Sequence, residues 1–387
     1  MKLVFFDFNA NFGGAPQGSV SLVKRLNECN EVFVIDAYGR CNEYCDAIRN
    51  SGINLSVLCP NVNRTVIGYH GIVRLAVGLS QLHNFIRLTF RLHRILKKIG
   101  PDVVWVNNYK SLFFLYIPWL KFRYPTFVYI RGWATRDQMS KMFLFLLKYK
   151  VRHIIAHSHA SIAQLVKLRI PEDKITYVPN AVDINSDTAV IIPATYLPHK
   201  DNKLVILLPA ARPEYLKGHL CAVKALKLIR DKGIEAVLWF PGRVATGVDN
   251  SFIETLNVLI KKLNLEEHVF FIGWRNDMPN VIRAADIVIL PSHTEGFPRV
   301  VIESMLLQRI VIATPVGGTP EAVFDGKTGF IMEIENDQQL AEKIKYIIDN
   351  PDICKTIISR AFVFAKKTFS PKIQTQLIQQ KFQAFKE

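Results

Sequence analysis

The sequence predicts an α/β protein of two domains, each built on a parallel sheet. Short apolar runs rich in β-branched residues alternate with longer segments of helical periodicity, which is typical of strand–helix–strand units. The 387 residues suffice for two domains of ordinary size. A polar, proline-containing segment without periodicity divides the chain. We therefore assign residues 1–185 and 204–368 to the two domains and residues 186–203 to the linker.

The first half opens with a predicted strand at Leu3–Phe6, a loop containing Gly13-Gly14, and a helix from about Gly18 to Asn27. A strand, a glycine-rich loop and a helix form a unit that can hold phosphate. The pair lacks the G-x-G-x-x-G pattern, so a plain turn is an equal alternative. The other strands predicted here are Glu31–Asp36, Asn54–Leu58, Val103–Val106, Thr126–Ile130 and His153–Ala156.

The second half repeats this alternation and ends in helix. Its predicted strands are Leu204–Leu208, Ala236–Phe240, Val269–Ile272, Asp286–Leu290 and Ile310–Ala313. The stretch Ile353–Phe385 is helical, and Phe369-Ser370-Pro371 predicts a break before a last helix within residues 369–387.

Composition limits the class of partner and the compartment. Residues 1–183 carry 24 Lys and Arg against 11 Asp and Glu, whereas the remainder carries 25 against 22. This asymmetry indicates an anionic partner for the first half: a membrane, a nucleic acid or an acidic substrate. Six cysteines without paired metal-like spacing favour reduced, buried thiols and the cytoplasm. No apolar run reaches the roughly 18 residues of a membrane span, and Leu3–Phe6 is too short for a signal peptide.

The most informative segment reads HTEGFPRVVIESM from His293 to Met305. It links a predicted strand to a helix expected at about Arg299–Gln308, with Pro298 suited to the first turn. Ligands of parallel sheets bind beyond the carboxyl ends of the strands, and a helix N-terminus favours phosphate. There Glu295 can accept hydrogen bonds from sugar hydroxyls and Glu303 from a ribose diol. The spacing alone also fits two solvated acids.

Two cations follow the first strand of the second half, in the loop Ala210–Gly218. Arg212 and Lys217 at a strand's carboxyl end suit a diphosphate. The alternative is a pair of solvated surface cations. A Pro-Gly-Arg turn containing Gly242 and Arg243 ends the next strand.

These motifs together closely resemble the donor-binding core of the retaining glycosyltransferases of family 4. The resemblance implies the GT-B fold, in which two Rossmann-like domains face each other across a cleft and the last helix crosses back to the first domain. It implies that Glu295 contacts the donor sugar and Glu303 the nucleotide ribose. Arg212 and Lys217 would stabilise the leaving diphosphate. Backbone amides of Gly296 and Phe297 would contact the sugar, and those of Val300 and Val301 the diphosphate. Donor binding is also implied for Gly13, Gly14, Gly242 and Arg243.

The first domain departs from the family pattern. Arg131 stands where many members have a histidine, and it cannot act as a general base because it stays protonated. It could contact an anionic acceptor or the donor phosphate. The resemblance implies that the leaving phosphate takes the acceptor's proton. No Asp-x-Asp metal motif occurs, so no metal cofactor is expected.

A basic amphipathic helix is predicted over His83–Gly100. Its cations form one stripe and its apolar residues another on the opposite side. The apolar stripe fits the domain core. The basic stripe fits either solvent or an anionic membrane. The cations are Arg87, Arg91, Arg94 and Lys98, and the apolar residues are Phe85, Leu88, Leu92, Ile95 and Ile99.

The resemblance predicts a retaining glycosyltransferase that moves a sugar from a UDP- or GDP-sugar to a glycan or lipid-linked glycan, in cell-surface polysaccharide or lipopolysaccharide biosynthesis. We expect it in the cytoplasm, either free or peripheral on the inner face of the plasma membrane. One alternative is a nucleotide-sugar epimerase of the same fold. The other is a basic nucleic-acid-binding protein, against which the lack of any recognised nucleic-acid motif argues.

Overall fold

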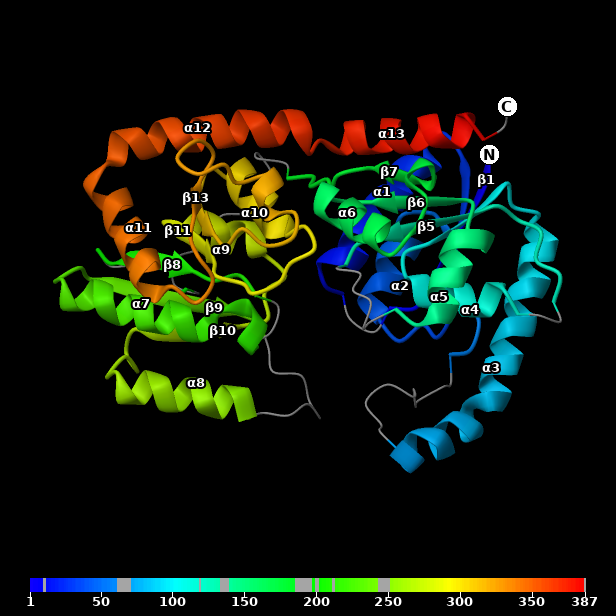
Figure 1. Ribbon diagram of the computed structural model, residues 1–387, viewed down its shortest axis with the longest axis horizontal. Helices are drawn as coiled ribbons and strands as arrows, with labels where there is room; N and C mark the ends of the chain where they lie inside the picture. Colours follow the sequence, from blue (N-terminus) through cyan, green and yellow to red (C-terminus); the bar gives the residue numbers. More distant parts are fainter. Residues whose placement is uncertain are drawn as a thin grey trace. The chain divides into compact units, whose positions relative to one another are not determined.

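The computed structural model divides the chain into two compact units (Figure 1). Unit 1 comprises Met1–Val178 with Thr375–Glu387, and unit 2 comprises Pro179–Gln374. The structure describes residues 1–9, 12–60, 71–117, 120–132, 139–184, 197–198, 202–210, 213–242 and 251–385, and for 71–81 the backbone only.

Unit 1 is a parallel sheet with the strand order β3-β2-β1-β4-β5-β6-β7. The order reverses at β1, as in Rossmann-like folds. All five predicted strands after β1 are present, and β7 was not predicted. The bounds are β1 (Lys2–Asp7), β2 (Glu31–Asp36), β3 (Asn54–Val57), β4 (Val103–Val106), β5 (Thr126–Ile130), β6 (His153–Ala156) and β7 (Ile175–Tyr177).

Helices cover both faces of this sheet. Buried residues of α1, α2 and α13 share one hydrophobic cluster with one face, and those of α3, α4 and α6 share another with the opposite face. Phe143 and Leu144 of α5 are partly buried against this second cluster. A π-helical turn, Leu146–Lys150, continues α5. The bounds are α1 (Gly14–Asn27), α2 (Asn42–Arg49), α3 (Gly71–Ile99), α4 (Leu112–Leu115), α5 (Lys141–Phe145), α6 (His159–Lys167) and α13 (Pro371–Gln383).

The start of α1 corrects the sequence prediction. The helix begins at Gly14, four residues before the expected Gly18, with Gly13 as its N-cap residue. Pro16 does not prevent this, because it lies in the first turn, where backbone N–H groups have no intrahelical partner. The predicted glycine pair is therefore the beginning of the helix itself.

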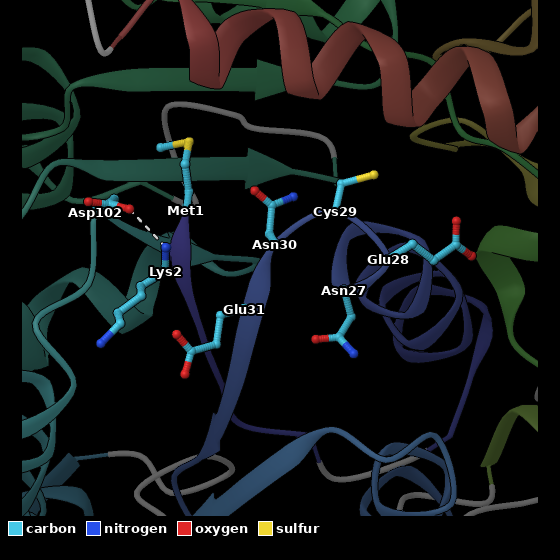
Figure 2. Close-up of a pocket in the computed structure, with 8 residues that line it drawn as sticks. All are labelled: Met1, Lys2, Asn27, Glu28, Cys29, Asn30, Glu31 and Asp102. Carbon is cyan, nitrogen blue, oxygen red and sulfur yellow. Dashed lines mark hydrogen bonds between the residues drawn. The ribbon is translucent and has the colours of Figure 1, made fainter.

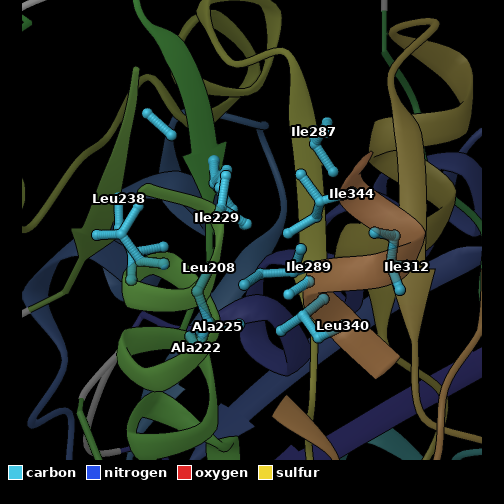
Figure 3. Packing of buried hydrophobic residues seen from close by; sticks show 14 of the residues in the cluster. Leu208, Ala222, Ala225, Ile229, Leu238, Ile287, Ile289, Ile312, Leu340 and Ile344 are labelled. Carbon is cyan, nitrogen blue, oxygen red and sulfur yellow. The ribbon is translucent and has the colours of Figure 1, made fainter. Parts of the chain in front are cut away.

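Unit 2 is a second parallel sheet with the order β10-β9-β8-β11-β12-β13. Figure 3 shows part of its core, where Leu340 and Ile344 of α11 pack against Ile289 and Ile312 of the strands. Two Rossmann-like units confirm the predicted fold class. The strands are β8 (Leu204–Leu207), β9 (Ala236–Pro241), β10 (Val269–Gly273), β11 (Ile287–Leu290), β12 (Ile310–Ala313) and β13 (Phe330–Ile331). The helices are α7 (His219–Asp231), α8 (Ser251–Lys262), α9 (Met278–Ala284), α10 (Arg299–Leu306), α11 (Asp337–Asp349) and α12 (Pro351–Thr368).

The chain passes from unit 1 to unit 2 at Val178, seven residues before the predicted boundary. The reason is that the next residues bond to unit 2: the Asn180 side chain donates to the Phe297 carbonyl (3.0 Å) and the Val182 amide to the Phe369 carbonyl (3.3 Å). Most of the predicted linker lies outside the described residues.

The last helix returns the chain to unit 1. Between α12 and α13 the helix is interrupted at Phe369-Ser370. Beyond this break the Arg25 Nε donates to the Thr375 hydroxyl (3.0 Å), and the Phe382 ring lies 5.3 Å from that of Phe127. The end of α13 therefore completes the hydrophobic core of unit 1.

Candidate functional site

An ion pair lies at the carboxyl edge of the unit 2 sheet. The Nζ of Lys217 is 2.8 Å from Oε1 of Glu295, and the two side chains are 28% and 13% exposed. Lys217 ends a short 3-10 turn after β8, and Glu295 lies in the loop after β11. Since β8 and β11 are neighbours in the sheet, the loops that follow them meet. The sequence predicted both residues for one site, and the structure brings them into contact.

The Glu295 carboxylate is held by its own loop as well. The Ser292 hydroxyl donates to the same oxygen, Oε1, at 2.8 Å. Within the described part of the chain, the other oxygen, Oε2, receives no hydrogen bond. One oxygen of a fixed and largely shielded carboxylate is thus available to accept a ligand hydroxyl.

Two glycines permit the close backbone packing around this ion pair. Gly218 has φ +75°, and a Cβ there would lie 2.0 Å from the Pro291 carbonyl oxygen. Gly317 has φ +55°, and its Cβ would lie 2.0 Å from the Glu295 carbonyl oxygen. The Gly318 amide donates to the Gly296 carbonyl at 2.6 Å. The loop of Glu295 is therefore clamped by the backbone after β12, which the sequence prediction did not include.

Gly296 and Phe297 contribute through their backbone. The Phe297 ring is buried and packs against the Phe369 ring, with centroids 5.3 Å apart. Its carbonyl accepts from Asn180. With the ring committed to the core, only the main chain of this residue can face a ligand.

Glu303 lies on α10, one turn after Arg299. Pro298 is the N-cap residue of this helix, one position before the predicted first turn. The Glu303 side chain is half-buried, and its Oε1 is 3.5 Å from Nη2 of Arg299. Burial raises the pKa of Glu303, and the neighbouring Arg299 partly opposes this. Arg299 also donates to the Ala181 carbonyl (3.1 Å), so it fixes the start of α10. Sequence reasoning missed Arg299, although its i,i+4 spacing to Glu303 was a signal.

Only some of the remaining predicted residues of unit 2 are among the described residues. Val301 is fully buried, and Val300 packs against the same hydrophobic cluster, so any ligand contact would come from their amides. The Gly242 amide donates to the Gly273 carbonyl at 2.8 Å, which joins the ends of β9 and β10. Arg212 and Arg243 lie outside the described residues.

In unit 1, Arg131 holds the start of α1. Its Nη1 donates to the Ser19 hydroxyl (2.9 Å) and to the Ala15 carbonyl, and its guanidinium lies over the Tyr129 ring, 4.4 Å from the centroid. These contacts position the helix that begins at Gly13-Gly14. Sequence reasoning had considered only a ligand contact for Arg131.

Two buried acids at the carboxyl ends of neighbouring strands were also missed. Asp7 and Asp36 lie opposite each other in the register of β1 and β2. Asp7 accepts from the Asn107 side chain (3.0 Å) and the Phe8 amide (2.9 Å), and Asp36 from the Tyr38 (3.0 Å) and Gly39 amides. Burial raises the pKa of both carboxyls. Because both carboxyls accept hydrogen bonds from other groups of the chain, these acids hold the loops after β1, β2 and β4 in place.

A shallow pocket occupies the opposite edge of the unit 1 sheet (Figure 2). It is lined by Lys2, Glu28, Glu31 and Asp102 among others, at the amino ends of β1 and β2. The Asp102 carboxylate accepts from the Lys2 amide at 2.8 Å. Because ligands of such sheets bind beyond the carboxyl ends of the strands, this pocket does not belong to the candidate site.

We also searched the described residues for metal-binding groups and for membrane-spanning helices. Among them, no group of three or more His, Cys, Asp or Glu side chains is arranged to hold a metal ion. The expectation that no metal cofactor is needed stays a prediction. Over the same residues, none of the helices combines the length and apolarity that crossing a bilayer requires.

Two family models match the chain. Residues 194–363 match Glycosyl transferases group 1, and residues 40–186 match Glycosyltransferase Family 4. The chain is 33% identical over 121 residues to an uncharacterized glycosyltransferase of Methanocaldococcus jannaschii, covering 31% of this chain and 34% of that protein. It is 24% identical over 297 residues, 71% of this chain and 75% of the other, to the Escherichia coli UDP-Gal:alpha-D-GlcNAc-diphosphoundecaprenol alpha-1,3-galactosyltransferase.

Solved structures share the fold. Anabaena HepE in complex with UDP-glucose superposes with a TM-score of 0.82 at 22% identity, covering 99% of this chain and 100% of that one. WaaG, a glycosyltransferase involved in lipopolysaccharide biosynthesis, superposes with a TM-score of 0.68 at 16% identity, covering 97% and 99%. The first curated relatives are matched over only about a third of their length (34% and 38%).

Proposed function

This chain belongs to the family 4 glycosyltransferases of the GT-B fold, and from that premise we propose that it transfers a sugar from a nucleoside diphosphate sugar to a glycan or lipid-linked glycan. The observation that supports this most is the ion pair of Lys217 with Glu295 at the carboxyl edge of the unit 2 sheet. It offers a cation for a diphosphate and a carboxylate for sugar hydroxyls at one place, with Glu303 on the following helix.

We propose a separate role for each side chain of this site. The Lys217 ammonium, 2.8 Å from Glu295, neutralises charge on the leaving diphosphate, together with Arg212. Glu295 accepts hydroxyls of the donor sugar, and Glu303 accepts the ribose diol. Ser292 keeps Glu295 in place when Lys217 turns to the phosphate. Stabilising charge that develops on the leaving group is typically the largest single contribution to such catalysis.

The proposed reaction retains the configuration at the anomeric carbon. The bond from that carbon to the diphosphate oxygen breaks, and a bond to the acceptor oxygen forms on the same face of the sugar. The acceptor's proton passes to the leaving phosphate, so no protein base is required. Arg131 is not needed as a base in this reaction, and it could not serve as one because it stays protonated.

For the donor we propose a UDP-sugar. The supporting observations are that HepE was solved with UDP-glucose and that the Escherichia coli relative is a UDP-Gal-dependent enzyme acting on a diphosphoundecaprenol-linked sugar. By the same reasoning we propose a role in cell-surface polysaccharide or lipopolysaccharide synthesis, on a glycan built on a lipid carrier at the cytoplasmic side of the membrane.

A donor-binding assay with a matched lysine control tests the proposal. Wild-type protein is melted with and without UDP, GDP and their sugars, since a ligand that binds the native state raises the melting temperature. Lys217→Met is expected to lose this stabilisation and to transfer sugar about 100- to 1,000-fold more slowly. Lys224→Met, an exposed lysine on α7, should behave as wild type.

Three outcomes would count against the assignment. If no nucleotide sugar raises the melting temperature, the proposed donor is wrong. If Lys217→Met transfers sugar at the wild-type rate, the proposed site is wrong. Conversion of the donor sugar without any acceptor would instead indicate an epimerase.

A further inference from the structure

The outer surface of three helices in unit 1 has a composition that the proposed donor site does not explain. The helices α3, α4 and α5 pack their inner residues against one cluster on the same face of the sheet. They are neighbours: the Phe85 ring of α3 lies 5.0 Å from the Phe113 ring of α4, and the Tyr109 ring, just before α4, lies 5.2 Å from the Phe143 ring of α5. The three helices therefore lie next to one another on this face of the sheet (Figure 1).

An apolar ridge runs along the outward side of α3. Leu82, Ile86 and Phe90 follow each other at four-residue intervals and are between 42% and 54% exposed, so they form one stripe of the helix. The predicted apolar stripe faces the core as expected: Leu88 and Leu92 are fully buried. The outward ridge is additional, and the sequence prediction had placed only cations on that side.

A second ridge lies on α5 and its π-helical continuation. Met142, Phe145 and Tyr149 are between 42% and 61% exposed, at the three- and four-residue spacing of one helical face. Phe113 of α4 is also exposed. Large apolar side chains thus reach solvent on all three helices, whereas single exposed residues would need no explanation.

Cations accompany both ridges, and acids are nearly absent. The exposed cations are Arg87, Arg94, Lys97 and Lys98 on α3, and Lys141 and Lys150 on α5 and its continuation. Between Ala47 and Ile170 the sequence holds only two acids, Asp102 and Asp137, and Asp102 accepts from the Lys2 amide at the amino edge of the sheet. Arg91 serves the fold, because it donates to the Leu58 carbonyl (2.5 Å).

We propose that this surface of α3, α4 and α5 binds the headgroup region of an anionic phospholipid bilayer. The ridges of Leu82, Ile86 and Phe90 and of Met142, Phe145 and Tyr149 enter the boundary between headgroups and acyl chains, while the flanking cations pair with lipid phosphates. Apolar side chains beside cations on an outward helix face fit this interface. A nucleic acid would use the cations but leave the ridges in water. The surface stands on its own contacts, and it extends the proposed function by holding the enzyme where a lipid-linked acceptor would lie.

Vesicle binding with paired variants tests this inference. Wild-type protein is sedimented with vesicles of phosphatidylcholine alone and of phosphatidylcholine mixed equally with phosphatidylglycerol, and should bind only the mixed vesicles. Arg87→Gln with Arg94→Gln should weaken that binding about thirty-fold, from the contribution of each cation near an anionic surface. Ile86→Ser with Phe90→Ser should bind at low salt and dissociate at high salt, where charge attraction is screened.

The control is Val258→Ser, which changes an exposed apolar residue of α8 in unit 2 and should bind as wild type. The inference is overturned if both vesicle types bind equally, if neither binds, or if the control loses as much binding as the Ile86 and Phe90 pair. Self-association of the wild type that these variants abolish would also overturn it, since the surface would then be a protein interface.

The donor assay separates this inference from the proposed function. The same variants should keep their stabilisation by UDP, because Lys217 and Glu295 belong to unit 2. If the wild type is stabilised by UDP but does not bind the mixed vesicles, the membrane surface alone is overturned. Absence of nucleotide binding in the wild type overturns the donor site and leaves the vesicle result standing.

Discussion

Replacing Gly317 by alanine should disable the donor loop without unfolding the protein. A Cβ at this position would lie 2.0 Å from the Glu295 carbonyl oxygen and 2.7 Å from that of Gly296. Both contacts are with backbone, which cannot rotate away as a side chain can. Because the Gly318 amide also holds the Gly296 carbonyl, the loop has to move as a unit.

The size of the effect follows from two separate costs. Alanine at φ +55° adopts the left-handed conformation at a cost of roughly 1–2 kcal/mol. Restoring a contact of 3.0 Å then requires the Glu295 backbone to shift by about 1 Å. A misplacement of this size near reacting groups can slow catalysis about 100-fold.

Gly326→Ala is the matched control. Gly326 has φ +67° in the same unit, and a Cβ there would meet nothing within 4 Å. In this control, alanine carries only the cost of the left-handed backbone conformation. That cost lowers the melting temperature by about 2–8 °C for a unit of this size. Thermal melting with and without UDP, together with kcat/KM for transfer, measures both effects. If Gly317→Ala binds UDP and turns over like Gly326→Ala, the clamp has no role in the site.

Two further predictions concern titratable groups whose pKa is shifted by burial. Glu303→Gln removes a carboxyl whose pKa is raised by burial. Because the charged form of this carboxyl is disfavoured in the folded state, the melting temperature of the variant at pH 7 should not fall. The donor KM of the variant should rise at least about tenfold, because a charged hydrogen-bond acceptor is lost. Lower stability with an unchanged KM in donor titrations would contradict this. Burial lowers the pKa of His157 and His219 to about 4, below the usual value of about 6.5. The neutral histidines therefore contribute to the free energy of unfolding above pH 6.5. This contribution should be lost as the pH falls to 4, by up to roughly 3 kcal/mol per histidine. Melting curves across this range should show a smaller loss for His219→Gln than for wild type, and parallel curves would refute the assignment.

The strands of the fold could be predicted because buried parallel strands are apolar and β-branched along their whole length. Ile154 and Ile155 in β6, or Val288 and Ile289 in β11, are such residues. The two strands that were missed are short and lie at sheet edges: β7 is three half-buried residues and β13 only Phe330–Ile331. An edge strand has one partner and need not be apolar on both faces.

The surface of α3 shows a different limit. The three- and four-residue spacing correctly predicted that Leu88 and Leu92 face the core. It could not identify Leu82, Ile86 and Phe90 as exposed, because a helix with apolar residues on two sides is indistinguishable in sequence from one buried on both. Only the packing on the sheet decides which stripe remains outside.

In the site, local motifs and tertiary contacts carry different information. The residue types at Lys217, Glu295 and Glu303 could be interpreted from sequence because each follows a strand within one strand–loop–helix unit. The contacts that fix Glu295 could not, since Gly317 and Gly218 owe their requirement for glycine to carbonyls of Glu295 and Pro291, in loops 22 and 73 residues away along the chain. A glycine in the left-handed region that meets nothing, such as Gly326, looks the same in sequence as one that clamps a carboxylate. The prediction for Gly317 therefore tests the tertiary clamp, whereas a substitution of Glu295 would test only the motif.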